Sequence, residues 1–178
     1  MKSDSNITIK EVISSDELKK FVMFPHTLYK DSKYWVAPII KEELEVLNKE
    51  TNPVFNNAVA HYFLAYIDGE IVGRIAALIN WIEVKDLKKK KVRFGWFDFI
   101  DDQNVSKALL EEVIEIGKKN NLEFIEGPVG FSNMDKAGML IKGFEKKNTM
   151  ITMYNYSYYQ DHMKAHGYSK LAEWVEYE

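Results

Sequence analysis

The chain has 178 residues, of which 46% are hydrophobic and 13% aromatic, so it can bury one sizeable core. Its formal net charge of −3, with lysines interspersed among acids, argues against nucleic-acid binding and against attraction to an anionic membrane surface. The lack of cysteine excludes disulfides, thiolate metal sites and a cysteine nucleophile, and no apolar run approaches the roughly 18 residues of a transmembrane helix.

The first elements in chain order are a short strand and a helix. Residues 1–6 are polar and lack the apolar core of a signal peptide, so we expect a cytoplasmic protein. Ile7–Ile13 alternates imperfectly and predicts an edge strand. Ser14 and Glu17 have the spacing of a capping box, which predicts that a helix begins directly after Ser14. We expect Pro25 to end this helix, because proline lacks the amide donor and clashes with the preceding turn.

A second helix is predicted after an aromatic-rich stretch. Pro38 fits its first position, and the helix would carry Ile40, Leu44 and Leu47 toward the core. The asparagine-rich segment Asn48–Asn57 then predicts a loop.

The clearest local signal is a β-hairpin. The apolar runs Tyr62–Ile67 and Ile71–Ile79 flank Asp68-Gly69, a pair that favours a type I′ turn. We interpret the lysine-rich segment Lys85–Lys91 as a solvated loop. The following segment, Val92–Ile100, is apolar on both alternating faces, which predicts a central strand covered on both sides.

A long amphipathic helix follows the central strand. Its apolar stripe, within Asn104–Asn120, should pack on the sheet. Leu122–Ile125 predicts a short strand. The next stretch, Val129–Met150, has no clear periodicity, and because long loops in compact domains are often functional, we expect substrate contacts there.

The last two predicted elements are a helix and a strand. Tyr154–His166 predicts a helix that Gly167 stops, and Ser169–Tyr177 alternates as a strand. Because an uncovered edge strand tends to pair with another chain, we expect a homo-oligomer or a longer native protein that covers this strand.

The element order predicts an α/β (α+β) fold with a mixed, mostly antiparallel twisted sheet and helices on both faces. Several phrases in this order are similar to those of one superfamily: Phe24-Pro25, Tyr34-Trp35-Val36-Ala37-Pro38, Gly73-Arg74-Ile75-Ala76-Ala77, Ile100-Asp101-Asp102-Gln103, Gly127-Pro128, Gly143-Phe144 and Tyr154-Asn155. The chain resembles the GNAT superfamily, which has the acyl-CoA N-acyltransferase fold, and within it a poorly characterised bacterial branch. The resemblance implies one domain over residues 1–178, or the N-terminal part of a longer protein.

The resemblance also implies a cofactor site. In the family, the acyl-CoA pyrophosphate binds at the start of the central helix on a loop of the form R/Q-x-x-G-x-G/A. The corresponding positions here are Asp101, Asn104 and Ser106, and none of them matches. A later register that begins at Gln103 matches the first and last positions. Asp101 and Asp102 would repel a phosphate, or they simply cap the helix. The implied binding residues for acetyl-CoA or another acyl-CoA are Phe97, Phe99, Asn104, Val105, Ser106 and Lys107.

The catalytic residues that the resemblance implies are a base and an acid. Family members use a tyrosine four residues before a Gly-aromatic pair as the acid, but that position is Met163 here. Tyr159, one turn earlier, can replace it only if the helix is displaced. Asp98 is the candidate base because burial in an apolar strand would desolvate its carboxylate, and Glu126 is a second candidate. The alternative for Asp98 is an ordinary ion pair, with Arg93 or a lysine.

Two functions therefore stay open. The first is an acyl-CoA-dependent N-acyltransferase that acts on an amine of a small molecule or peptide. The second is a non-catalytic module of the same fold that binds a ligand or a protein, which the imperfect loop and the shifted tyrosine favour. His162 and His166 have the i, i+4 spacing of metal ligands but lack the glutamate of H-E-x-x-H, so we expect no metal.

Overall fold

A computed structural model describes residues 6–132, 134–149 and 153–175. Its elements are β1 (Thr8–Glu11), α1 (Ser15–Leu28), α2 (Ile40–Leu47), η1 (Pro53–Asn56), β2 (Ala58–Ile67), β3 (Glu70–Asn80), η2 (Ile82–Asp86), β4 (Lys91–Phe99), α3 (Gln103–Lys119), β5 (Phe124–Glu126) and α4 (Tyr158–Ala165). No helix in these ranges is both long enough and apolar enough to span a membrane.

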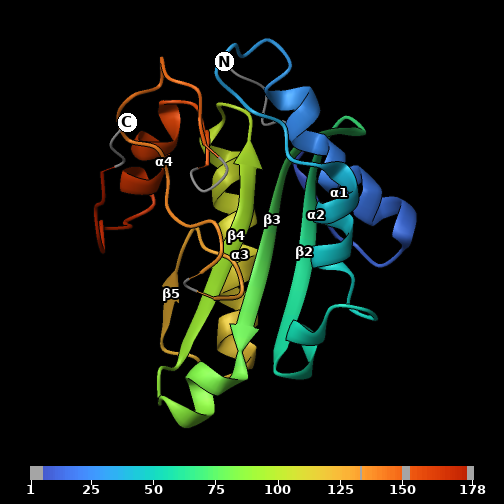
Figure 1. Ribbon diagram of the computed structural model, residues 1–178, viewed down its shortest axis with the longest axis vertical. Helices are drawn as coiled ribbons and strands as arrows, with labels where there is room; N and C mark the ends of the chain where they lie inside the picture. Colours follow the sequence, from blue (N-terminus) through green and yellow to red (C-terminus); the bar gives the residue numbers. More distant parts are fainter. Residues whose placement is uncertain (1–5, 133, 150–152, 176–178) are drawn as a thin grey trace.

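The strands form one sheet in the order β1-β2-β3-β4-β5. Every neighbouring pair is antiparallel except β4 and β5, which are parallel. Figure 1 shows α1 and α2 on one face of this sheet and α3 on the other. This arrangement confirms the predicted fold class.

The hairpin between β2 and β3 forms as its sequence predicts. Asp68 and Gly69 both have positive φ, at 51° and 85°, as a type I′ turn requires. The register pairs Ile67 with Glu70 directly across this turn. As a result, successive residues of β2 face opposite layers: Phe63 belongs to the core under α3 and Leu64 to the core under α1 and α2.

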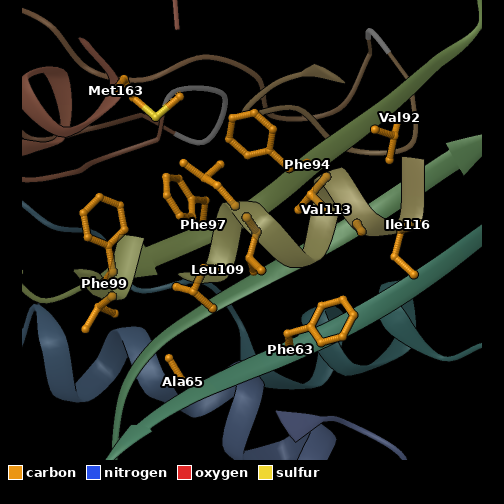
Figure 2. Packing of buried hydrophobic residues seen from close by; sticks show 14 of the residues in the cluster. Phe63, Ala65, Val92, Phe94, Phe97, Phe99, Leu109, Val113, Ile116 and Met163 are labelled. Carbon is orange, nitrogen blue, oxygen red and sulfur yellow. The ribbon is translucent and has the colours of Figure 1, made fainter. Parts of the chain in front are cut away.

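The larger core lies between α3 and the sheet. Figure 2 shows Leu109, Val113 and Ile116 of α3 directed at the strands, with Phe63 and Phe94 among the residues they meet. Full burial of a residue such as Leu109 contributes about 1.5–3 kcal/mol. The predicted apolar stripe of this helix is confirmed. Its packing on the sheet holds the N-terminus of α3 close to the C-terminal end of β4.

The prediction that Pro25 ends the first helix is wrong. α1 begins with its predicted capping box and continues through Pro25 to Leu28. Proline has no N–H to donate to the carbonyl of Phe21, four residues earlier. That carbonyl instead accepts a hydrogen bond from Arg74 Nη1 at 2.8 Å. The helix can therefore continue, because a neighbouring strand satisfies the acceptor that proline leaves free.

The solvated interpretation of the lysine-rich loop is wrong for its last residue. Its other lysines are exposed, but Lys91 begins β4 and is buried. Its Nζ lies 3.2 Å from Glu83 Oε1 and 2.5 Å from Glu126 Oε2. Glu83 also pairs with Arg93, 2.7 Å away. These carboxylates offset the cost of burying two cations beside β5.

Two helix starts and the last predicted strand also differ from the predictions. α2 begins at Ile40 rather than Pro38, and α4 begins at Tyr158 rather than Tyr154, although Gly167 follows α4 with φ +80° as expected. Residues 169–175 form no strand, because alternation does not by itself supply a hydrogen-bonding partner. Glu176 and Tyr177 lie outside the described residues, and self-association stays a prediction without the support of this strand.

Candidate functional site

The site is built around a bulge in β4. The register pairs Arg74 with Asp98 and Ala76 with Gly95, so β4 has one residue more than β3 between these pairs. Trp96 lies in this bulge and has a φ of +45°, which is rare for a bulky side chain. A bulge re-aims the side chains that follow it. Here it places Asp98 directly across from Arg74.

The Asp98 carboxylate is buried and ion-paired. Arg74 donates to Asp98 Oδ2 from Nε and from Nη2, at 2.8 Å each, and the two side chains are only 5% and 6% exposed. The partner of Asp98 is thus Arg74, whereas the predicted alternative partner Arg93 pairs with Glu83. Asp98 Oδ1 accepts the Tyr29 hydroxyl at 2.7 Å. Of the roughly four acceptor positions of a carboxylate, described residues use three, which leaves one on Oδ1.

Two tyrosines extend from Asp98 to the backbone of β4. Tyr29 Oη lies 2.8 Å from Tyr159 Oη, and the Phe99 N–H donates to Tyr159 Oη at 3.1 Å. Burial raises the pKa of Tyr29 and of Tyr159 well above the ordinary value, and the charge of Asp98 raises both further. Both phenols therefore stay neutral near pH 7. The structure thus joins Asp98 and Tyr159, the predicted base and acid, through Tyr29.

Two hollows meet at Asp98. A cavity of about 220 Å³ is lined by Tyr29, Arg74 and Asp98, and its wall carries Trp35 and Trp96. A second, much smaller hollow of about 10 Å³ is also lined by Asp98, together with Phe97, Met139 and Tyr159. Asp98 therefore faces both spaces, whereas Tyr29 lines the larger and Tyr159 the smaller.

The acyl-CoA-binding residues that the resemblance implies on β4 are buried, and tyrosines of α4 bond the backbone of one of them. Phe97, Phe99 and Val105 are buried in the core under α3. The Phe99 N–H bonds Tyr159, and its carbonyl accepts the Tyr158 hydroxyl at 2.5 Å. Figure 2 shows Met163 of α4 next to Phe97. The position where family members carry their acid is thus an apolar Met163 in the core, and Tyr159 lies one helical turn earlier.

The predicted phosphate site at the start of α3 is covered by histidines of α4. Ser106 is buried, and its Oγ donates to the Gln103 carbonyl. His162 Nδ1 and His166 Nε2 each lie 2.8 Å from the same Oγ. A phosphate can reach Ser106 Oγ only if these two histidine side chains move away.

The acidic residues at this helix start have structural partners. The Asp102 carboxylate accepts the Asn104 N–H at 2.9 Å, which confirms the capping interpretation. Asp101 Oδ1 lies 3.0 Å from His162 Nε2. Asn104 and Lys107 are exposed, with Lys107 Nζ 3.8 Å from Glu111. Among the described residues, no group of three His, Cys, Asp or Glu could hold a metal ion.

Tyr29 and Arg74 are the site residues that sequence reasoning missed. Arg74 stands out as a charge inside an apolar hairpin strand, so its burial could have been inferred. Tyr29 carries no such signal, because it lies 69 residues from Asp98 and 130 from Tyr159. Only the packing of α1 on the sheet brings the three together.

Two curated proteins are similar to the chain in sequence. No family model matches the chain. It is 30% identical over 172 residues to Protein YghO of Escherichia coli K12, covering 94% of this chain and 44% of that protein. It is 25% identical over 176 residues to the bacterial ceramide synthase of Caulobacter vibrioides, covering 98% and 46%. The chain thus spans less than half the length of these relatives.

Solved structures show the fold. A predicted acetyltransferase from Clostridium acetobutylicum, solved with acetyl-CoA, matches with a TM-score of 0.59 at 13% identity, over 97% of this chain and 96% of that one. An aminoglycoside acetyltransferase from an uncultured soil sample, in complex with sisomicin, matches with a TM-score of 0.56 at 13% identity, over 97% and 94%. The chain has the GNAT fold, as its sequence resemblance predicts.

Proposed function

We propose that these residues form an acyl-CoA-dependent N-acyltransferase domain, which transfers an acyl group to a primary amine. The observation that carries the proposal is that Asp98, a buried carboxylate with one acceptor position left, lines the larger cavity and is joined through the Tyr29 hydroxyl to Tyr159. Transfer between two substrates needs such an arrangement, since the amine and the thioester must meet with a base and an acid in reach.

The two predicted catalytic residues take the roles that their positions allow. Asp98 accepts a proton from the attacking amine in the larger cavity. Tyr159, at the smaller hollow, donates its proton to the sulfur that leaves. A neutral phenol suits this second role, because burial raises its pKa and the phenol keeps its proton until a stronger base forms beside it.

Acyl-CoA is a substrate in this proposal, and the fit of its binding residues depends on α4. Asn104 and Lys107 are exposed at the start of α3, where an amide and a cation suit a phosphate. Ser106 and the Phe99 backbone are covered by His162 and by the tyrosines of α4. We therefore expect the His162 and His166 side chains to leave Ser106 when acyl-CoA binds, while Tyr159 keeps its hydrogen bonds to Phe99 and Tyr29.

The acceptor that the larger cavity favours is an amine with an apolar body. Its walls carry Trp35, Trp96, Val46 and Val129, and Glu43 adds a carboxylate that accepts the Trp96 indole N–H at 2.7 Å. Aromatic walls and carboxylates attract an ammonium group, while the apolar area holds a carbon chain.

The name of one relative supports the same class. A ceramide is an amide of a long-chain amino alcohol, so the name ceramide synthase denotes N-acylation of an amphiphilic amine. We extend this class to the present chain as part of the proposal, together with a fatty acyl or acetyl group as the group transferred.

The test is an amine-dependent thiol release assay. Purified protein would be mixed with acyl-CoA donors of two chain lengths and with three acceptors: a long-chain amino alcohol, a short primary amine and an aminoglycoside. The proposal expects thiol release matched by amide formation, fastest with the long-chain amine. Binding of CoA by calorimetry without transfer to any amine would instead favour the non-catalytic module, which the coverage of Ser106 by α4 also allows.

A further inference from the structure

The hydroxyl protons between Asp98 and Phe99 have only one consistent arrangement. The Phe99 N–H can only donate, and the Asp98 carboxylate, paired with Arg74, can only accept. Tyr159 must therefore donate to Tyr29, and Tyr29 must donate to Asp98. Each of these three hydrogen bonds therefore has its donor on the Phe99 side and its acceptor on the Asp98 side. While Asp98 is charged, the Tyr159 proton is directed at Tyr29 and is not available to a leaving sulfur.

We infer that Tyr29 is a proton relay that couples the two halves of the reaction, so that Tyr159 protonates the leaving sulfur only after Asp98 has taken the amine proton. This inference rests on the proposed function. Once protonated, Asp98 becomes a donor, and the chain from Asp98 through Tyr29 to Tyr159 can reverse its direction. The direction of these hydrogen bonds thus makes the proton of Tyr159 depend on whether Asp98 is protonated.

The proton balance closes with one proton moved. As the C–N bond forms and the C–S bond breaks, the proton of the amine nitrogen passes to Asp98 Oδ1. Asp98 then gives a proton to Tyr29, Tyr29 gives its own to Tyr159, and Tyr159 gives its own to the thiolate sulfur. Asp98 is then a carboxylate again and both phenols are neutral, so no oxidant or further reactant is needed.

The surroundings of Tyr29 hold it in this position. Its ring is buried, with Trp35, Tyr154 and Tyr156 at centroid distances of 5.4, 5.6 and 5.1 Å. The high pKa of both phenols means that neither can remain a phenolate near pH 7. A phenol that has given up its proton must therefore be reprotonated at once, and Tyr29 is the group in hydrogen-bond contact with Tyr159 that can do so.

The test is a double-mutant cycle on kcat. Tyr29→Phe removes the relay hydroxyl and keeps the ring, and the inference expects kcat to fall by about 10²-fold or more with little change in the KM of the amine. Tyr159→Phe should cause a similar fall, and the double variant should be no slower than the slower single variant, because both changes break one chain.

The matched control is Tyr62→Phe. Tyr62 is also buried, and its hydroxyl donates to the Leu47 carbonyl at 2.9 Å, but it belongs to the other core. Tyr62→Phe should have a stability similar to that of Tyr29→Phe, and its kcat should be nearly that of the wild type. If Tyr29→Phe behaves like Tyr62→Phe while the wild-type protein is active, the relay is wrong and the proposed function stands.

A measurement on the wild-type protein covers the case in which Tyr29→Phe does not fold. The rate in mixtures of H₂O and D₂O should curve downward with deuterium content, because several protons move in one step. A linear dependence would overturn the relay. A wild-type protein that transfers no acyl group to any amine would overturn the proposed function, and the relay with it.

Discussion

Arg74 donates from Nη1 to the Phe21 carbonyl, and the same guanidinium holds Asp98 through its other two nitrogens. One buried side chain therefore joins α1, β3 and β4. It satisfies the carbonyl that Pro25 leaves free and neutralises the carboxylate at the bulge. Arg74 thus links the candidate base to α1, where Pro25 leaves the Phe21 carbonyl free.

The first prediction concerns this ion pair. Arg74→Met should lower the free energy of unfolding by about 3–5 kcal/mol, because it leaves a buried carboxylate without its partner. The double variant Arg74→Met, Asp98→Leu should recover part of the loss, since neither charge remains, although the Phe21 carbonyl and the Tyr29 hydroxyl lose their partners. Urea unfolding monitored by tryptophan fluorescence measures both. A loss below about 1 kcal/mol in the single variant would show that water reaches Asp98.

The second prediction concerns the acids before α3. Replacing Asp101 and Asp102 with Asn should tighten CoA binding, because two negative charges leave the place where the pyrophosphate would dock. Asn still caps a helix, so the stability should change by less than about 1 kcal/mol. Calorimetry at low and moderate salt measures the affinity. An unchanged affinity would mean that the phosphate does not bind at this helix start.

The third prediction concerns the candidate acid. Tyr159→Phe should lower kcat by about 10²–10⁴-fold. It should also cost about 1–3 kcal/mol of stability, because the Phe99 N–H loses its acceptor, so the thermal midpoint will fall too. Steady-state rates well below the midpoint separate the two effects. Equal activity losses in Tyr159→Phe and Tyr62→Phe would mark Tyr159 as a core residue only.

The fourth prediction concerns stability and pH. Burial lowers the pKa of His26 and of His166 below the ordinary 6.5, with Arg74 adding to the effect on His26 and His162 to that on His166. The unfolded chain therefore binds more protons, so the stability is fully present above about pH 6.5 and is lost as the pH falls through the folded-state pKa values.

Urea unfolding near pH 7.5 and pH 5.5 checks this dependence. The double variant His26→Gln, His166→Gln should lose less stability between about pH 7.5 and pH 5.5 than the wild type does, because neither side chain can titrate. An identical loss in both proteins would assign the effect to other groups.

Local signals in the sequence were enough for much of the fold. Asp68-Gly69 and the capping box at Ser14 act within a few residues, and both formed as predicted. Pro25 was misread because its effect is offset by Arg74, a residue 49 positions further along the chain. The strand predicted from Ser169 failed because alternation cannot show whether a partner is present.

The candidate site was predictable only in part. Asp98 was found because an isolated carboxylate in an apolar strand must be buried and paired. Its partner was not, since Arg74 and Arg93 both lie in strands, and only the register across the bulge decides between them. The coverage of Ser106 by α4 likewise depends on tertiary packing, which no spacing in the sequence encodes.

Amine-dependent release of CoA thiol by the wild-type protein, with the amide quantified in the same reaction, distinguishes an acyltransferase from a binding module. We predict one amide for each thiol released, the fastest rate with a long-chain amine, and a rate at least about 10²-fold lower in Tyr159→Phe than in Tyr62→Phe. Tight CoA binding without thiol release for any amine would contradict this prediction and identify the domain as a binding module.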